Sequence, residues 1–220
     1  MALPAPRAEL MSLLLARLAA LIVALIGGLI LLAWQLPIPR LTEAFPGLAS
    51  MTPAVAGGFV AAAIGLFCLT FRPIRLISRV IGVALVVLGL AIFSQDLFGL
   101  QLGLDQALIR ADSAGTAQTE DLRLAPGVTG LLIIFGLALL YAKQGGITSA
   151  FSQVLALIII GQILIVLASY AYGVADDYYA FPFTHMSMYG AVCGLLLGLG
   201  LLAASPEYGI GAAIVEQSPA

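Results

Sequence analysis

The stretch from Gln144 to Ala175, QGGITSAFSQVLALIIIGQILIVLASYAYGVA, contains no charged residue. A helix needs about 20 mainly apolar residues to cross the hydrocarbon core of a bilayer, so this stretch predicts a transmembrane helix near 149–172. The same search predicts five more, near 13–35, 54–71, 75–95, 126–142 and 187–204. The expected fold class is therefore all-α, a polytopic integral membrane bundle of six transmembrane helices. The bundle would occupy 13–205, between a cytoplasmic N-terminal segment 1–12 and a short cytoplasmic tail 206–220.

The composition of the whole chain also favours a membrane location. Hydrophobic residues make up 62% of the 220 residues and charged residues only 9%, whereas a soluble domain is about 45–50% apolar and about 25% charged. Lipid must therefore be the solvent for much of the surface, and the bilayer is the first expected partner. The net charge of −2 excludes nucleic acid as a partner, because a nucleic-acid footprint needs clustered Lys and Arg.

Basic residues fall mainly on one side of the expected helices. With the N-terminus inside, the inner side carries Arg7, Arg17, Arg72, Arg75, Arg79 and Lys143. The outer side carries Arg40, Arg110 and Arg123, together with most of the acidic residues. The positive-inside rule then predicts that both termini are cytoplasmic. We expect the long side chains of Arg17, Arg75 and Arg79 to reach the membrane interface from nearby helix ends.

A weak internal repeat is visible. Met51-Thr-Pro-Ala-Val-Ala-Gly57 matches Leu124-Ala-Pro-Gly-Val-Thr-Gly130, and each opens an expected helix. Ser78-Arg-Val-Ile81 matches Ser152-Gln-Val-Leu155, so the offsets are 73 and 74 residues. Met186-Ser-Met-Tyr-Gly190 then opens a third unit. Repetition at a fixed period indicates structural units of one kind, here arranged in parallel.

Five segments between Ala33 and Gly209 carry a resemblance through their order and spacing. They are Ala33-Trp-Gln-Leu-Pro-Ile-Pro39, Phe45-Pro-Gly-Leu-Ala-Ser-Met-Thr-Pro53, Asp96-Leu-Phe-Gly-Leu-Gln-Leu-Gly-Leu-Asp-Gln106, Tyr170-Ala-Tyr-Gly173 and the stretch 186–209. In them the chain resembles the multi-pass N-terminal membrane region that precedes PAS-type histidine kinases and diguanylate cyclases in bacteria. The resemblance implies a sensor or input module of the bacterial inner membrane, involved in signal transduction through helix or partner contacts.

The C-terminal end departs from this family, in which a helical linker and a signalling domain follow the last helix. Residues 210–220 are too few for an output domain, and we expect a free-standing relative. An accessory or structural subunit of a larger respiratory or photosynthetic membrane complex is the alternative. A transporter ranks third, because no ionisable residue lies at the middle of an expected helix.

His185 is the single histidine, beside Met186 and Met188 at the outer mouth. Imidazole with thioethers suits copper, and one histidine could ligate a haem or chlorin, so His185 is the candidate cofactor-binding residue. The alternative is an interfacial polar residue. The sequence requires no cofactor, and it lacks Cys/His spacing typical of a metal site.

Acidic and aromatic residues gather in the outer connection after the fifth expected helix. They are Tyr170, Tyr172, Asp176, Asp177, Tyr178 and Tyr179. Aromatic faces attract cations, so this segment is the candidate ligand or partner contact. The alternative is an aromatic belt that anchors helix ends in the headgroup region.

Small and polar residues inside the expected helices are candidates for helix packing. Gly57, Gly65, Gly194 and Gly198 offer faces for close approach, and the last two have the small-xxx-small spacing. Gln162 lies near the middle of the fifth expected helix and is expected to hydrogen-bond to another helix. These contacts are expected mainly within one chain, with other membrane subunits or a homo-oligomer as the alternative. No arrangement of nucleophile, acid and base appears, so we expect no enzymatic activity.

Overall fold

The computed structural model describes residues 6–35, 51, 53–98, 126–172 and 186–205. Over these residues the structure is all-α and contains no strand. Its helices are α1 (Pro6–Gln35), α3 (Pro53–Leu69), α4 (Arg75–Phe98), α6 (Pro126–Tyr141), α7 (Gly146–Ala171) and α8 (Met188–Ala204), with a 3-10 helix η2 (Arg72–Ile74) before α4. The expected all-α class is confirmed for this part of the chain.

Local sequence explains where several helices begin. α1, α3 and α6 each start with a proline, whose fixed φ and missing N–H suit the first helical position. α8 follows Ser187, whose hydroxyl accepts a hydrogen bond from the backbone N–H of Gly190 at 3.1 Å. α7 follows a glycine turn, in which Gly145 and Gly146 have φ of 92° and 54°. Glycine favours this left-handed region because it has no Cβ.

The helix ends differ from expectation by a few residues. α1 starts at Pro6 rather than near 13, and α7 starts at Gly146 rather than near 149. The apolar run marks only the part of a helix that faces lipid or core. Arg and Glu have good helix propensity, so Arg7 and Glu9 extend α1 beyond the apolar run.

Three of the six helices are long and apolar enough to cross a membrane. They cover Leu10–Ala33, Arg72–Ser94 and Gly146–Ala171. The other three, α3, α6 and α8, are apolar but have only 16 or 17 residues. At about 1.5 Å per residue they fall short of a hydrocarbon core of about 30 Å. Length and composition therefore show three candidate spans, not six.

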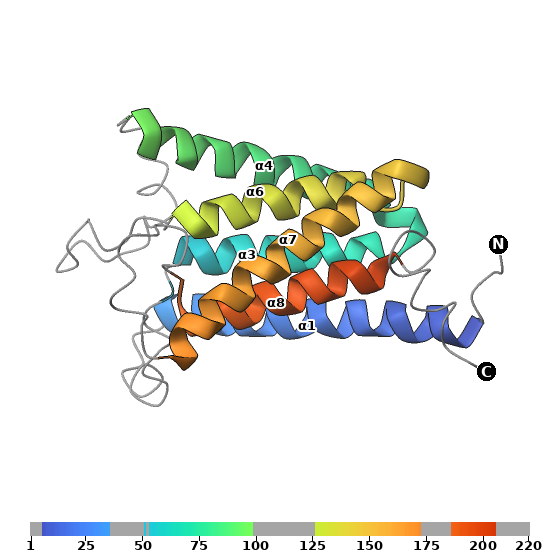
Figure 1. The fold of residues 1–220 in the computed structure, drawn as a ribbon, viewed down its shortest axis with the longest axis horizontal. Coiled ribbons are helices and arrows are strands. Elements are labelled where there is room, and N and C mark those ends of the chain that lie inside the picture. Colours follow the sequence, from blue (N-terminus) through green and yellow to red (C-terminus); the bar gives the residue numbers. More distant parts are fainter. Residues whose placement is uncertain (1–5, 36–50, 52, 99–125, 173–185, 206–220) are drawn as a thin grey trace.

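Long and short helices alternate around a closed ring. Each helix contacts the next along the chain, and α8 contacts α1. The short helices α3, α6 and α8 also contact one another, so they occupy the middle of the ring. Figure 1 shows α1 and α4 along opposite edges of the bundle, with the short helices between them and α7 running obliquely.

The long helices expose apolar side chains on their outer faces. These include Leu14, Leu18, Leu21 and Leu25 of α1, Val80, Val83 and Val87 of α4, and Ile158, Leu164 and Ile165 of α7. Soluble monomers rarely expose continuous apolar patches of this extent. The three outer faces therefore fit a location in lipid.

The chain direction places two kinds of connection at opposite ends of the bundle. α1 begins and α8 ends at the same end as the short α3–α4 and α6–α7 turns, which we call the terminal end (Figure 1). α3, α6 and α8 begin at the other end, which we call the loop end. An even number of helices between the two termini produces this arrangement.

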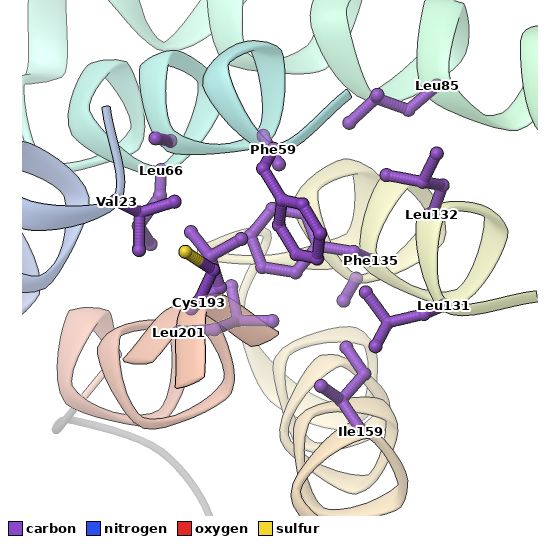
Figure 2. Packing of buried hydrophobic residues seen from close by; sticks show 14 of the residues in the cluster. Val23, Phe59, Leu66, Leu85, Leu131, Leu132, Phe135, Ile159, Cys193 and Leu201 are labelled. Atoms are coloured by element: carbon purple, nitrogen blue, oxygen red, sulfur yellow. The ribbon is translucent and has the colours of Figure 1, made fainter. Parts of the chain in front are cut away.

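Three leucines form a layer between the short helices. Leu66 of α3, Leu139 of α6 and Leu201 of α8 are at most 1% exposed. Neighbouring glycines allow them to approach: a Cβ added at Gly65 would lie 2.6 Å from Leu139 Cδ1, and one at Gly200 would lie 2.7 Å from Leu66 Cδ2. Beside this layer, Figure 2 shows the rings of Phe59 and Phe135 near the centre of the core.

Two helix pairs, α1–α3 and α4–α6, pack through the same contact. A Cβ added at Gly27 of α1 would lie 2.7 Å from Val60 Cγ2 of α3 and 3.2 Å from a backbone oxygen of α3. One added at Gly89 of α4 would lie 2.5 Å from Ile133 Cγ1 of α6 and 3.4 Å from a backbone oxygen of α6. In each pair the long helix supplies the glycine and the short helix supplies the branched side chain.

The third pair, α7–α8, fills this position the other way round. Ile163 of α7 stands 74 residues after Gly89, so the long helix now supplies the branched side chain. The short helix supplies the glycine, because a Cβ added at Gly194 would lie 2.8 Å from Ile163 Cδ1.

Candidate functional site

Tyr170 connects α7 to the start of α8 at the loop end. Its hydroxyl donates a hydrogen bond of 2.7 Å to the carbonyl oxygen of Met186, just before α8. Tyr172 is 82% exposed. The remaining residues of the expected outer site, Asp176, Asp177, Tyr178, Tyr179 and the candidate cofactor residue His185, lie outside the described residues.

The α7–α8 interface contains two of the expected packing glycines. A Cβ added at Gly198 would lie 2.8 Å from Ile160 Cγ1, and Gly194 packs on Ile163 as described above. Gly65 lies against Leu139 of α6. Gly57 is different, because a Cβ there would meet no atom within 4 Å, so a side chain has room at that position.

Gln162 links α7 to α6. Its side-chain Nε2 donates a hydrogen bond of 3.1 Å to the carbonyl oxygen of Gly127 in the first turn of α6. One turn and a half earlier on α7, the Ser152 hydroxyl donates to the carbonyl oxygen of Ala138 at 2.8 Å. Both polar side chains of α7 therefore bond to α6 backbone oxygens.

Arg17 joins α1 to the turn after α3 at the terminal end. Its Nε donates to Thr70 Oγ1 at 3.2 Å, and its guanidinium carbon lies 4.2 Å from the centroid of the Phe71 ring. The ring face attracts the cation. The Thr70 hydroxyl donates in turn to the carbonyl oxygen of Phe67 at 2.8 Å. Arg17 is thus fixed within the bundle rather than simply extended to the interface.

Gln153 joins α7 to the end of α8, also at the terminal end. Its Nε2 donates a hydrogen bond of 2.9 Å to the carbonyl oxygen of Ser205, the residue that follows α8. Gln153 is 2% exposed and Ser205 is 3% exposed. A buried amide without a partner would be costly, so this bond fixes the end of α8 against α7.

Sequence reasoning did not identify the Arg17 and Gln153 bonds. Their partners lie 53 and 52 residues away along the chain, and no spacing within a single helix indicates a contact at that distance. The usable signal was the polarity of Gln153 and Arg17 inside otherwise apolar runs, because such residues seek partners on other helices.

The described side chains offer hydroxyl, amide and guanidinium groups, which suit hydrogen bonding and anion binding. Among the residues that the structure describes, no group of three or more His, Cys, Asp or Glu side chains could hold a metal ion. Cys68 and Cys193 are buried free thiols.

Comparison of the chain with protein-family models, with curated proteins and with solved structures finds no match.

Proposed function

We propose that the chain is a six-span protein of the bacterial inner membrane that acts as a non-catalytic input module. The apolar outer faces of α1, α4 and α7 support a location in lipid. The shorter α3, α6 and α8 lie among the long helices, where protein rather than lipid surrounds their ends. Backbone that is buried in protein is tolerated at membrane depth, so these helices can cross without matching the full bilayer thickness.

The terminal end is the cytoplasmic end in this proposal. Arg17, Arg72, Arg75, Arg79 and Lys143 all lie on α1, on the α3–α4 turn and its helix, or on the α6–α7 turn. Cytoplasmic segments of membrane proteins carry an excess of Lys and Arg. The loop end then faces outward, with Tyr170 and Tyr172.

The attachment of α8 to α7 at both ends carries the functional proposal. At the loop end Tyr170 bonds to Met186, and at the terminal end Gln153 bonds to Ser205. Between them, Gly194 and Gly198 bring the helices into close contact. A movement of α7 caused at the loop end is therefore passed to Ser205, where the chain leaves α8. An input module needs such a connection between an outer face and a cytoplasmic segment.

We also infer that the chain consists of three copies of one helix pair. Matched contacts recur at Gly27 and Gly89, which are 62 residues apart, and at Val60 and Ile133, which are 73 residues apart. A repeated pair that cannot bury its apolar face alone closes its core by packing against its neighbours.

Single-cysteine labelling tests topology and transmission together. With Cys68 and Cys193 changed to Ala, cysteines at Ser113 and Ser218 are labelled by an impermeant maleimide in vesicles of each orientation. We expect the two positions to react from opposite sides. We then expect Tyr170→Phe to change the labelling rate at Ser218, and Tyr172→Phe, the matched exposed tyrosine, to leave it unchanged.

Two results would contradict this proposal. Labelling of both positions from the same side would contradict the six-span topology. An unchanged Ser218 rate in Tyr170→Phe would contradict transmission through α7–α8. Stoichiometric co-purification of other membrane subunits, with that unchanged rate, would favour an accessory subunit instead.

A further inference from the structure

The terminal ends of the first and third helix pairs carry equivalent bonds. Arg17 on α1 bonds to Thr70 after α3, and Gln153 on α7 bonds to Ser205 after α8. In both pairs the donor lies on the long helix and the acceptor is the first residue after the short helix. Each bond joins the two helices of one pair.

Helix register identifies the corresponding positions in the second pair. Ser205 lies seven residues after Gly198, and Gln153 lies three residues before Ala156. A Cβ added at Gly198 would lie 3.6 Å from the Ala156 carbonyl oxygen. This contact fixes how far the two helices are shifted relative to each other.

The same contact occurs between α4 and α6, where a Cβ added at Gly136 would lie 2.7 Å from the Gly82 carbonyl oxygen. Three residues before Gly82 is Arg79, and seven residues after Gly136 is Lys143. The second pair therefore has two cations at the positions where the other pairs have a donor and an acceptor. Neither an ammonium nor a guanidinium can accept a hydrogen bond, so Arg79 and Lys143 cannot form this bond with each other.

Nothing in the described part of the chain compensates these charges with an acid. No Asp or Glu is among the residues whose side chains the structure describes. Arg79 is exposed, and it makes no hydrogen bond or ion pair with the described residues. Two cations at one end of a helix pair attract an anion, which can accept hydrogen bonds from both.

We propose that the headgroup phosphate of an anionic phospholipid binds at Arg79 and Lys143 and replaces the missing bond of the second helix pair. The apolar outer face of α4 continues from this position through Leu76, Val80, Val83 and Val87, which are 50–70% exposed. Their spacing places them on one face of the helix, along which acyl chains can lie. A free phosphate would use only the two cations, whereas a phospholipid uses the cations and the adjoining apolar face.

Native mass spectrometry of the full chain in mild detergent tests this site. The probes are phosphatidylglycerol, phosphatidylcholine with the same acyl chains, and inorganic phosphate. We expect selective retention of phosphatidylglycerol. Loss of a charge-assisted hydrogen bond in Arg79→Gln or Lys143→Ser should weaken that retention by about tenfold or more. Arg72→Gln removes an equal exposed charge from the same turn, and general surface attraction predicts a loss of about fivefold at most.

The double variant Arg79→Gln/Lys143→Ser copies the Gln153–Ser205 pair. It should fold even if a single variant does not, and its thermal stability in detergent should no longer increase when phosphatidylglycerol is added. Equal losses in Arg72→Gln and Arg79→Gln would overturn the site. So would equal retention of the two lipids, or retention of inorganic phosphate that displaces phosphatidylglycerol.

This inference rests on the proposed membrane location, and the two can fail separately. Wild-type protein released from membranes by alkaline carbonate would contradict the membrane proposal itself. Protein that stays in the membrane fraction but shows no preference for phosphatidylglycerol would contradict the lipid site alone.

Discussion

The α4–α6 and α7–α8 pairs solve the same packing problem with opposite choices. In α4–α6 the long helix supplies Gly89 and the short helix supplies Ile133; in α7–α8 the long helix supplies Ile163 and the short helix supplies Gly194. Interiors are close-packed, so what the position requires is one branched side chain against one glycine. The difference teaches that the volume at a contact is fixed while the helix that supplies it is not.

The α4–α6 pair is also the closer of the two, which predicts the largest effect. A Cβ added at Gly136 would lie 2.7 Å from the Gly82 carbonyl oxygen, a backbone atom that cannot move without the helix. Gly136→Ala should therefore lower the free energy of unfolding by about 1–3 kcal/mol, the usual cost of overpacking. Reversible unfolding in detergent measures this change.

Gly57→Ala is the matched control. A Cβ at Gly57 would meet no atom within 4 Å, and alanine has the better helix propensity, by up to about 1 kcal/mol. We expect Gly57→Ala to be neutral or stabilising. Equal destabilisation by both variants would show that the α4–α6 backbones do not approach as closely as the structure has them.

The exchange of large and small residues predicts a coupling of intermediate size. Gly89→Ala should destabilise, because its Cβ would lie 2.5 Å from Ile133 Cγ1, and Ile133→Ala should destabilise by leaving a cavity. The double variant should cost less than the sum of the two, with a coupling energy of about 0.5–3 kcal/mol. A double-mutant cycle of unfolding free energies measures it.

The corresponding control uses positions that do not touch across this interface. Combining Gly89→Ala with Ile159→Ala on α7 should give additive effects, because substitutions at independent sites usually add within about 0.3–0.5 kcal/mol. Additivity in the Gly89/Ile133 cycle as well would contradict volume complementarity at this contact.

The sequence predicted the helices well because continuous apolar runs report burial in lipid or core directly. It also identified Gly194 and Gly198, which share one helix face and a spacing of four. It did not identify the Gly82–Gly136 contact or the match between Gly27 and Gly89, because these depend on the relative shift of two helices. That shift follows from packing between segments far apart in the chain, which the pattern of one helix does not contain.

The candidate sites divide along the same line. Gln162 could be expected to bond to another helix because an amide in an apolar run needs a partner, but its acceptor, the Gly127 carbonyl oxygen, is a backbone atom with no sequence signal. The pairing of Arg17 with Thr70 and of Gln153 with Ser205 requires the register of the folded pairs. The expected outer residues from Asp176 to His185 lie outside the described residues, so that prediction stays a prediction.

The smallest predicted effect concerns two serines at matched positions of α4 and α7. Ser152 donates to the Ala138 carbonyl oxygen at 2.8 Å, whereas the buried hydroxyl of Ser78 has no hydrogen-bond partner in the described part of the chain. Polar bonds between membrane helices contribute about 0.6 kcal/mol on average, and the Ala138 oxygen keeps its bond from the Ala142 N–H. Ser152→Ala should thus destabilise by about that amount. Ser78→Ala removes an unsatisfied hydroxyl and should be neutral or slightly stabilising. Parallel thermal unfolding of the two variants checks the sign, and a loss of stability in Ser78→Ala equal to that in Ser152→Ala would mean that Ser78 has a partner.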